Sequence, residues 1–434
     1  MVTATVKGVF LRQREYGICW PGNRYDIDRH IQEYTEKLLK MGEKLGVNIE
    51  CEAPFYDLSD VAKLETEERE HPSDGIFILA LGLRTWGLAG RIASIGRPTV
   101  IFTPLFCFSD QIRELSRKEG VYLISTLDSD TVEYGIRMIK AVKQLQSSRI
   151  IVLKGDEPAP KDTEIHPFGT KVRTIARQKF VNELNNIGET EEVLTIASEY
   201  IQKAEKVVEP TREDVINAAK TYFASRNILK DFDGDAISLD CLGLLGAQLI
   251  HTTPCLGFSK LNDEGVPAGC EADIDSILTM VLVRHLFSKP SFMTDPTVDT
   301  EKNRWIGSHC TSATKLSGIG GQSEPFFLRG YAHLNLGVSP QVIWRKGQEV
   351  TLIKFRPKEN VMKIGEGKVA GNIDFATPAN MCITSVEVEV DGVKDMRDVE
   401  GSVHVMLMYG NHLKELSAFC QLMGISGSTI NASP

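Results

Sequence analysis

The stretch Gly75–Leu81, GIFILAL, is a short run of apolar residues that follows the turn-forming segment His71–Asp74. A run of this length without polar alternation predicts a β-strand that is buried on both faces. Two further runs of this kind, Pro98–Phe102 and Val121–Ser125, follow along the chain, with segments of helical periodicity between the runs. Buried strands that alternate with helices indicate a parallel sheet covered on both sides.

The alternation of predicted strands and helices begins again with the run RIIVLK at Arg149–Lys154. We expect helices over Val172–Ile187, Thr190–Lys206, Thr211–Ser225 and Ala272–Phe287, and a strand at Ala236–Leu239. After Pro290 short runs of β-type residues alternate with Gly, Asn and Asp turns, which is typical of a barrel or a sandwich. The sequence therefore predicts an α/β protein with two Rossmann-like, doubly wound parallel-sheet domains, residues 1–147 and 148–289, followed by a β-barrel-like domain over residues 290–434.

The composition excludes several classes of protein. With 42% hydrophobic and 25% charged residues among 434, the chain is neither disordered nor collagen-like. Its formal net charge of -9 argues against nucleic acid or an anionic membrane surface as a partner. The nine cysteines include no C-x-x-C pair, which suggests a reducing compartment. The first residues show no apolar signal region, and no apolar run approaches the roughly 20 residues that span a bilayer. We expect a cytoplasmic protein.

The nucleotide-binding motifs are incomplete. The segment Gly365–Lys368 resembles the end of a phosphate loop but continues into Val369 instead of Ser or Thr. The segment Gly318–Gly321 lacks the last glycine of the dinucleotide fingerprint. The two α/β domains therefore carry neither of these phosphate-binding signatures.

The stretch Pro267–Asp295, PAGCEADIDSILTMVLVRHLFSKPSFMTD, places two carboxylates around a strongly apolar helix. Glu271 stands at the start of the helix, and Asp295 follows the apolar run Ser291–Met293. Because the helix leaves one end of the domain and the strand returns, both carboxylates can meet at the same end. The alternative is that Glu271 only stabilises the helix N-terminus through the helix dipole.

Two histidines are candidates for the same site. His309 ends the run WIGSH, and His412 follows the last β run, in the sequence Tyr-Gly-Asn-His. A buried structural histidine is the alternative for His309, and a turn or helix cap is the alternative for His412. Two carboxylates and an imidazole form a mixed oxygen and nitrogen set that suits Mn²⁺, Co²⁺, Fe²⁺ or Mg²⁺ and leaves positions open for substrate oxygens. The other histidines, His404 among them, receive no functional role.

These pieces together resemble one superfamily. The segments that carry the resemblance are Cys270-Glu271-x-Asp273, Lys289-Pro290-x-Phe292-x-x-Asp295, His309-Cys310, Gly410-Asn411-His412 and Asp233–Leu242 with its Asp240-Cys241 pair. They are similar to the L-fucose isomerase and L-arabinose isomerase superfamily, nearer to the fucose isomerases. The resemblance covers the second half of the chain well and the N-terminal domain only by architecture.

The resemblance implies a divalent metal, often Mn²⁺, held by Glu271, Asp295 and His412, with His309 as a further substrate or metal contact. It also implies a homo-oligomer, for which hexamers are frequent in the family, and a small-molecule sugar as substrate. The expected activity is that of a metal-dependent aldose–ketose isomerase, which moves a proton between C1 and C2 through a cis-enediol(ate). Glu271 and Asp295 would then be the acid–base pair as well as metal ligands.

Sugar hydroxyl groups need polar partners. We expect substrate contacts from Asn303 and Trp305, which are near the proposed site in sequence, and from Arg12, Trp20 and Asn23, which follow the first strand. Arginines in this loop would suit an anionic sugar, sulfonated or phosphorylated; the alternative is a solvated surface loop. A non-catalytic sugar-binding or regulatory protein on the same fold is the competing function, and a metal-dependent lyase or hydrolase is a third.

Overall fold

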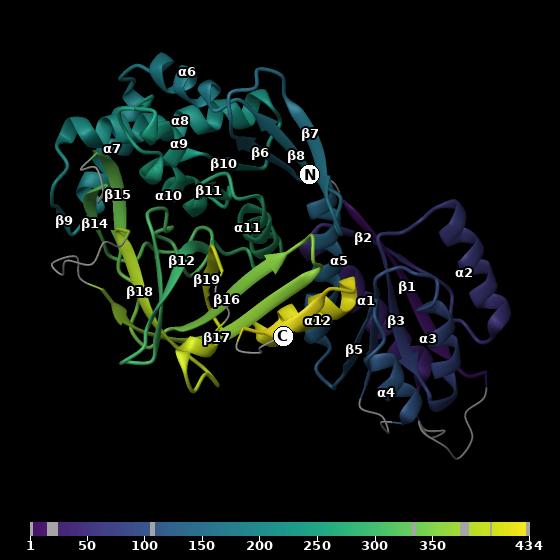
Figure 1. The fold of residues 1–434 in the computed structure, drawn as a ribbon. Coiled ribbons are helices and arrows are strands. Elements are labelled where there is room, and N and C mark those ends of the chain that lie inside the picture. The colour runs from purple at the N-terminus through teal and green to yellow at the C-terminus, as the bar shows by residue number, and fades with distance from the viewer. Residues whose placement is uncertain are drawn as a thin grey trace. The chain divides into compact units, whose positions relative to one another are not determined.

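The chain folds into two units, residues 1–144 with 414–427 and residues 145–413 with 428–434. The computed structural model, drawn as a ribbon in Figure 1, describes residues 3–14, 25–104, 109–331, 336–373, 382–399 and 402–430. Among these residues no helix is both long enough and apolar enough to cross a membrane.

The first unit contains a parallel sheet with the strand order β2-β1-β3-β4-β5. Its strands are β1 (Ala4–Arg12), β2 (Val47–Cys51), β3 (Gly75–Leu81), β4 (Thr99–Thr103) and β5 (Val121–Ser125). The central strand β3 is the apolar run GIFILAL, and all seven of its residues are buried, as its pattern predicts.

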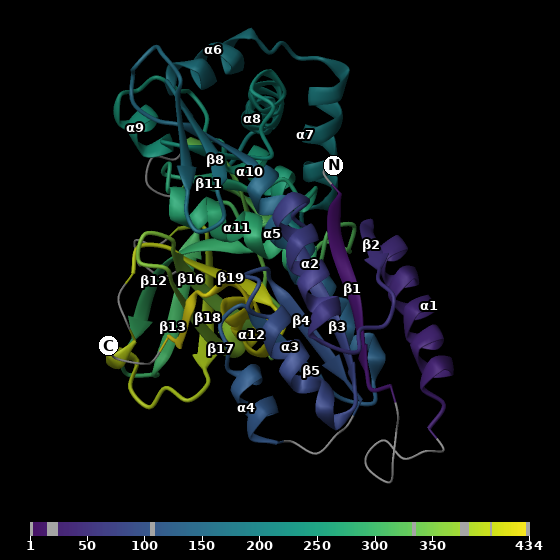
Figure 2. The ribbon, with the colours of Figure 1, turned by 90° about the vertical axis from the view of Figure 1, so that its right-hand side faces the viewer.

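Helices cover both faces of this sheet, as Figure 2 shows. Buried side chains of α2 (Leu58–Glu70), α3 (Trp86–Ile92) and α4 (Asp110–Ser116) pack against one face. On the other face α1 (Ile27–Leu45) and α5 (Val132–Ser147) approach closely. Gly75 and Gly135 permit this approach, because a Cβ at either position would lie under 3 Å from a side chain.

The second unit contains a sheet with the order β11-β10-β6-β8-β7, in which only the edge strand β7 is antiparallel. Its strands are β6 (Arg149–Leu153), β7 (Lys161–Ile165), β8 (Thr170–Ile175), β10 (Ala236–Leu239) and β11 (Ala268–Cys270). Its helices are α6 (Gln178–Asn186), α7 (Glu191–Lys203), α8 (Arg212–Asp231), α9 (Cys241–Gly246), α10 (Cys255–Asp263) and α11 (Ile274–Phe287). The helix expected from Val172 starts later, because Thr170–Ile175 pairs with both β6 and β7 as a strand.

An antiparallel barrel follows in the same unit. Its six strands run in the order β16-β19-β12-β13-β18-β17, and pairing of β17 with β16 closes it. The strands are β12 (Phe292–Asp299), β13 (Arg304–His309), β16 (Glu349–Arg356), β17 (Val361–Asn372), β18 (Thr384–Val390) and β19 (Val405–Tyr409). A small sheet of β9 (Lys206–Val207), β14 (Phe326–Tyr331) and β15 (Leu336–Val342) lies in this unit as well. The predicted fold class, two mainly parallel α/β sheets and a C-terminal barrel, is confirmed.

Trp305 belongs to the interior of the second unit. Its side chain is 1% exposed and lies in one hydrophobic cluster with Phe292, Trp344 and Val388. Its ring also fills the space beside Gly307, where a Cβ would lie 2.6 Å from it.

We therefore expect Trp305→Ala to lower the free energy of unfolding by about 3–5 kcal/mol, because it removes a large buried side chain and leaves a cavity. Urea denaturation measures this effect, with Val208→Ala, an exposed site in the same unit, as the control. Unchanged stability of Trp305→Ala would contradict the assignment of this side chain to the core.

Candidate metal centre

Four side chains that can bind a metal meet in the second unit. Glu271 follows β11, Asp295 lies in β12, His309 ends β13 and His404 directly precedes β19. One ligand atom from each lies within 4.8 Å of the ligand atoms of the other three. Since β19, β12 and β13 are neighbours in the barrel, three of the four residues come from adjacent strands.

Strand register explains this convergence. In the antiparallel pair of β12 and β19, Thr294 pairs with Val405, so the next residues along, Asp295 and His404, face each other. On its other side Asp295 pairs with Ser308, which is the neighbour of His309 in the chain. The barrel therefore brings one carboxylate and two imidazoles together, and the carboxyl end of β11 supplies Glu271.

The backbone is strained where these side chains leave it. Glu271 and Ala272 have φ angles of 62° and 52°, and His404 has a φ angle of 54°. Left-handed conformations of residues other than glycine are unfavourable and cluster at functional sites. At this site they fix the direction of one carboxylate and of one imidazole.

His404 is held between carboxylates on both sides of its ring. Its Nε2 lies 3.3 Å from Oε2 of Glu271 and 3.3 Å from Oδ1 of Asp295. Its Nδ1 lies 2.8 Å from Oδ2 of Asp273, the N-cap residue of α11. A carboxylate on Nδ1 is the usual partner of a metal-binding histidine, because it fixes the ring and directs Nε2 to the metal.

The ring nitrogens of His309 have different hydrogen-bond partners from those of His404. Its Nδ1 accepts a hydrogen bond of 2.8 Å from the backbone N–H of Cys310. A neutral imidazole that accepts at Nδ1 carries its proton on Nε2. Burial lowers the pKa of His309, against the charges of Asp295 and Glu271, and so favours this neutral form. Its Nε2, 3.8 Å from Oε1 of Glu271, is then a hydrogen-bond donor and not a metal ligand.

The donor set fits a divalent cation. The side chains of His309 and His404 are 5% and 2% exposed, and neither Nε2 has a hydrogen-bond partner among the described residues. The carboxylates of Glu271 and Asp295 are 28% and 47% exposed, so they border solvent. Two ligands of one ion at about 2.1 Å lie at most about 4.2 Å apart, and both carboxylates place an oxygen 3.3 Å from Nε2 of His404. A cation here would compensate two converging negative charges and satisfy Nε2 of His404.

The charge on His404 in the metal-free protein is the basis of a pH prediction. Burial alone would lower the pKa of His404, but the carboxylates of Asp273, Asp295 and Glu271 outweigh it and raise the pKa to about 11. The proton on His404 therefore stabilises the folded, metal-free protein at pH values below the ordinary pKa of histidine. This stabilisation is lost as the pH rises toward 11. A metal can bind Nε2 only after the proton has left.

We expect Mn²⁺ binding near neutral pH to release about one proton, and the apparent affinity to rise about tenfold per pH unit. Calorimetric titration in buffers of different ionisation enthalpy measures the proton release. Binding that releases no proton would show that Nε2 of His404 is not a ligand.

Asp273 offers a test of how His404 is oriented. Asp273→Asn keeps an oxygen that can cap α11, where the carboxylate accepts from the backbone N–H groups of Asp275 and Ser276. It removes the charge beside Nδ1 of His404. We expect metal affinity to fall about 10–100-fold, as is typical for the loss of such an outer partner. Asp275→Asn, in the first turn of the same helix, is the control, and an equal loss in both variants would contradict the assignment.

The structure brings together Glu271, Asp295 and His309, all three of which were predicted for the site. It does not bring His412 into this group of ligands. His412 lies after β19, with its Nε2 3.2 Å from Nζ of Lys289 and its ring 4.3 Å from that of Phe287. His404, to which the sequence assigned no role, takes the place in the ligand set that was predicted for His412.

The predicted substrate contacts lie in other surroundings. Asn303 is in the turn between β12 and β13, where its amide bonds the backbone of Val393 and Met396. Trp305 is in the core described above. In the first unit, Arg12 forms an ion pair with Asp28. Trp20 and Asn23 lie outside the described residues. None of these observations tests a contact with a sugar, which stays a prediction.

The fold and the ligand set define an α/β protein with a C-terminal barrel and a candidate centre for a divalent metal. No known protein-family model matches this sequence, and a comparison with curated proteins finds no match either.

Proposed function

We propose that this protein is a metal-dependent aldose–ketose isomerase of the L-fucose and L-arabinose isomerase type. The observation that carries the proposal is the site itself, with two partly exposed carboxylates and two buried imidazoles within 4.8 Å of one another. A divalent cation bound there, Mn²⁺ in the first instance, would supply Lewis-acid polarisation of two neighbouring substrate oxygens.

The ligand atoms divide into two groups. Nε2 of His404, Oε2 of Glu271 and Oδ1 of Asp295 form the closest set, with both carboxylate oxygens 3.3 Å from the nitrogen. Three ligands of this kind leave positions open for substrate. The other oxygen of Glu271 points toward His309 and stays available as a proton acceptor.

Isomerisation needs a proton to move between C1 and C2 of the sugar. In the proposal the free oxygen of Glu271 or Asp295 takes the proton from one carbon and returns it to the other. General acid–base help of this kind contributes typically about 10²–10⁴-fold to the rate. The N–H at Nε2 of His309 would donate to a substrate oxygen and hold it as negative charge develops there.

The substrate is a fucose-like or arabinose-like sugar, or an anionic one. The ion pair between Arg12 and Asp28 in the first unit gives no particular support to an anionic sugar, so both kinds belong in the test. The homo-oligomer that the resemblance implies is part of the same proposal.

The experiment is to incubate Mn²⁺-loaded and chelator-treated protein in D₂O with a panel of aldoses, including sulfonated and phosphorylated ones. We expect a ketose that carries solvent deuterium to appear by NMR only with the metal-loaded protein. Sugar binding without ketose or exchange would favour the non-catalytic alternative, and cleavage fragments would favour a lyase or hydrolase.

A further inference from the structure

A cavity in the same unit lies away from the metal centre. It has a volume of about 510 Å³, within the range of roughly 300–1,000 Å³ that small-molecule sites occupy. Its walls come from the end of α8, the turn before β10, the turn before β11 and the last turns of α11. The metal centre lies at the opposite ends of β11 and α11, and α11 spans about 21 Å at 1.5 Å per residue.

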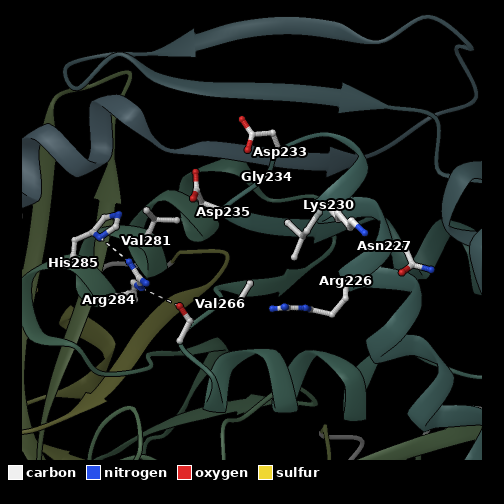
Figure 3. Close-up of a pocket in the computed structure, with 12 residues that line it drawn as sticks. Arg226, Asn227, Lys230, Asp233, Gly234, Asp235, Val266, Val281, Arg284 and His285 are labelled. Carbon is white, nitrogen blue, oxygen red and sulfur yellow. Dashed lines mark hydrogen bonds between the residues drawn. The ribbon is translucent and has the colours of Figure 1, made fainter. Parts of the chain in front are cut away.

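Three cationic side chains line this cavity, namely Arg226, Lys230 and Arg284. None of them forms a salt bridge with any residue that the structure describes. Figure 3 shows Arg226 extending from α8 toward the side of the cavity that Arg284 lines, with Val266 between them. In a chain with a net charge of -9, three cations that have no salt-bridge partner among the described residues thus line one cavity.

Helix stability does not explain this arrangement. Cations are favoured in the last turn of a helix, which accounts for Lys230 in α8 and Arg284 in α11. Arg226 lies one turn earlier than Lys230, and like charges four residues apart on a helix repel each other. The pair therefore costs stability in the absence of an anion between the two side chains.

The guanidinium of Arg284 is already oriented. Its Nε donates to the carbonyl oxygen of Gly265 at 3.0 Å, and its Nη1 lies 3.1 Å from Nδ1 of His285. On its other side the His285 ring contacts Ser148 through Nε2 at 3.1 Å. A guanidinium fixed in this way loses less side-chain entropy when it binds an anion.

Two acidic residues also line the cavity, and among the described residues neither forms a salt bridge with any of the three cations. Asp233 pairs with the guanidinium of Arg149 at 3.2 Å, and Asp235 accepts the backbone N–H of Arg149 at 2.9 Å. Apolar side chains of Leu229, Val266 and Val281 form part of the remaining wall, beside Asn227 and His285. The cavity is much larger than one phosphate group and has both cationic and apolar walls. It therefore suits a ligand in which an anionic group is attached to an organic moiety.

We propose that this cavity is a binding site for a small organic phosphate or sulfonate, separate from the metal centre. Phosphate and sulfonate groups share the chemistry that Arg226, Lys230 and Arg284 recognise, since each presents several oxygens to charged N–H donors. This site does not depend on the proposed isomerase activity.

The test is calorimetric titration of the full-length protein at low ionic strength with inorganic phosphate, glycerol 3-phosphate and propanesulfonate, and with glycerol as the uncharged control. We expect saturable binding of glycerol 3-phosphate, of propanesulfonate or of both, equal in metal-loaded and metal-free protein, and none of glycerol. The double variant Arg226→Gln/Lys230→Gln, at two exposed positions, should weaken binding at least about tenfold, because a single hydrogen bond to a charged group contributes about that much.

The matched control is Arg212→Gln/Lys346→Gln, which removes the same charges from exposed positions away from the cavity. It should bind as the wild type does. No saturable binding of either organic anion up to about 10 mM, a range that includes weak millimolar affinity, would overturn the proposal. So would equal weakening in both double variants, or binding that is lost when the metal is removed.

Discussion

His404→Gln is expected to abolish stoichiometric metal binding. The substitution removes the imidazole whose Nε2 lies 3.3 Å from a carboxylate oxygen of both Glu271 and Asp295. A glutamine is too weak a ligand to replace it, and the two carboxylates remain with no cation between them. Because the loss of an outer partner alone costs about 10–100-fold, we expect the affinity for Mn²⁺ to fall at least about 100-fold. Metal analysis after dialysis, together with a binding titration, measures this without any assay of activity.

The matched control is His412→Gln, the same substitution beyond the other end of β19. His412 contacts Lys289 and Phe287, so its loss should leave metal content unchanged. Thermal unfolding of both variants separates loss of metal from loss of fold. Metal retained by His404→Gln and lost by His412→Gln would restore the ligand set that the resemblance implied.

Glu271→Gln is expected to eliminate most of the proposed isomerisation while the protein stays folded. Glutamine has nearly the same size, but it lacks the charge and the proton-accepting oxygen that the proposed mechanism needs. Loss of both acid–base help and charge stabilisation should lower turnover at least about 10³-fold at saturating Mn²⁺. Ketose formation and the exchange of the C2 proton in D₂O are the two measurements.

Metal occupancy has to be measured on the same sample, because Glu271 is also a proposed ligand. Glu301→Gln, in the exposed turn between β12 and β13, is the control for a lost carboxylate and should turn over as the wild type does. Wild-type turnover by fully loaded Glu271→Gln would remove Glu271 from the proton transfer and leave the metal centre standing.

The sequence predicts the layers of the fold because the period of apolar residues is a local property. The short run Gly75–Leu81 after a turn favours a buried strand, and the longer apolar stretch after Asp273 favours a buried helix; both form as predicted. Where two patterns overlap, pairing decides, as for Thr170–Ile175, which forms an edge hairpin with β7 and not the start of a helix. Glu271, Asp295 and His309 were predictable for a related reason, since each is a polar group at or near the end of a buried apolar segment.

The local sequence pattern did not show whether His404 or His412 belongs to the metal centre. The two residues flank the five-residue strand β19, which separates its ends by roughly 16 Å. Only the register of β19 against β12 shows which end meets Asp295. His412, beyond the other end, lies beside Phe287. The position of His404 directly before an apolar strand was the one signal in the sequence that matches that of the other ligands.

The sequence by itself thus determined most of the helices and strands, their order and three of the four side chains of the centre. These depend on residues close together in the chain. The tertiary structure decided the fourth side chain of the centre (His404), the interior position of Trp305 and the cationic cavity at the far end of α11. Each of these depends on strand register or on packing between elements distant in sequence, and no local pattern of residues encodes such distances.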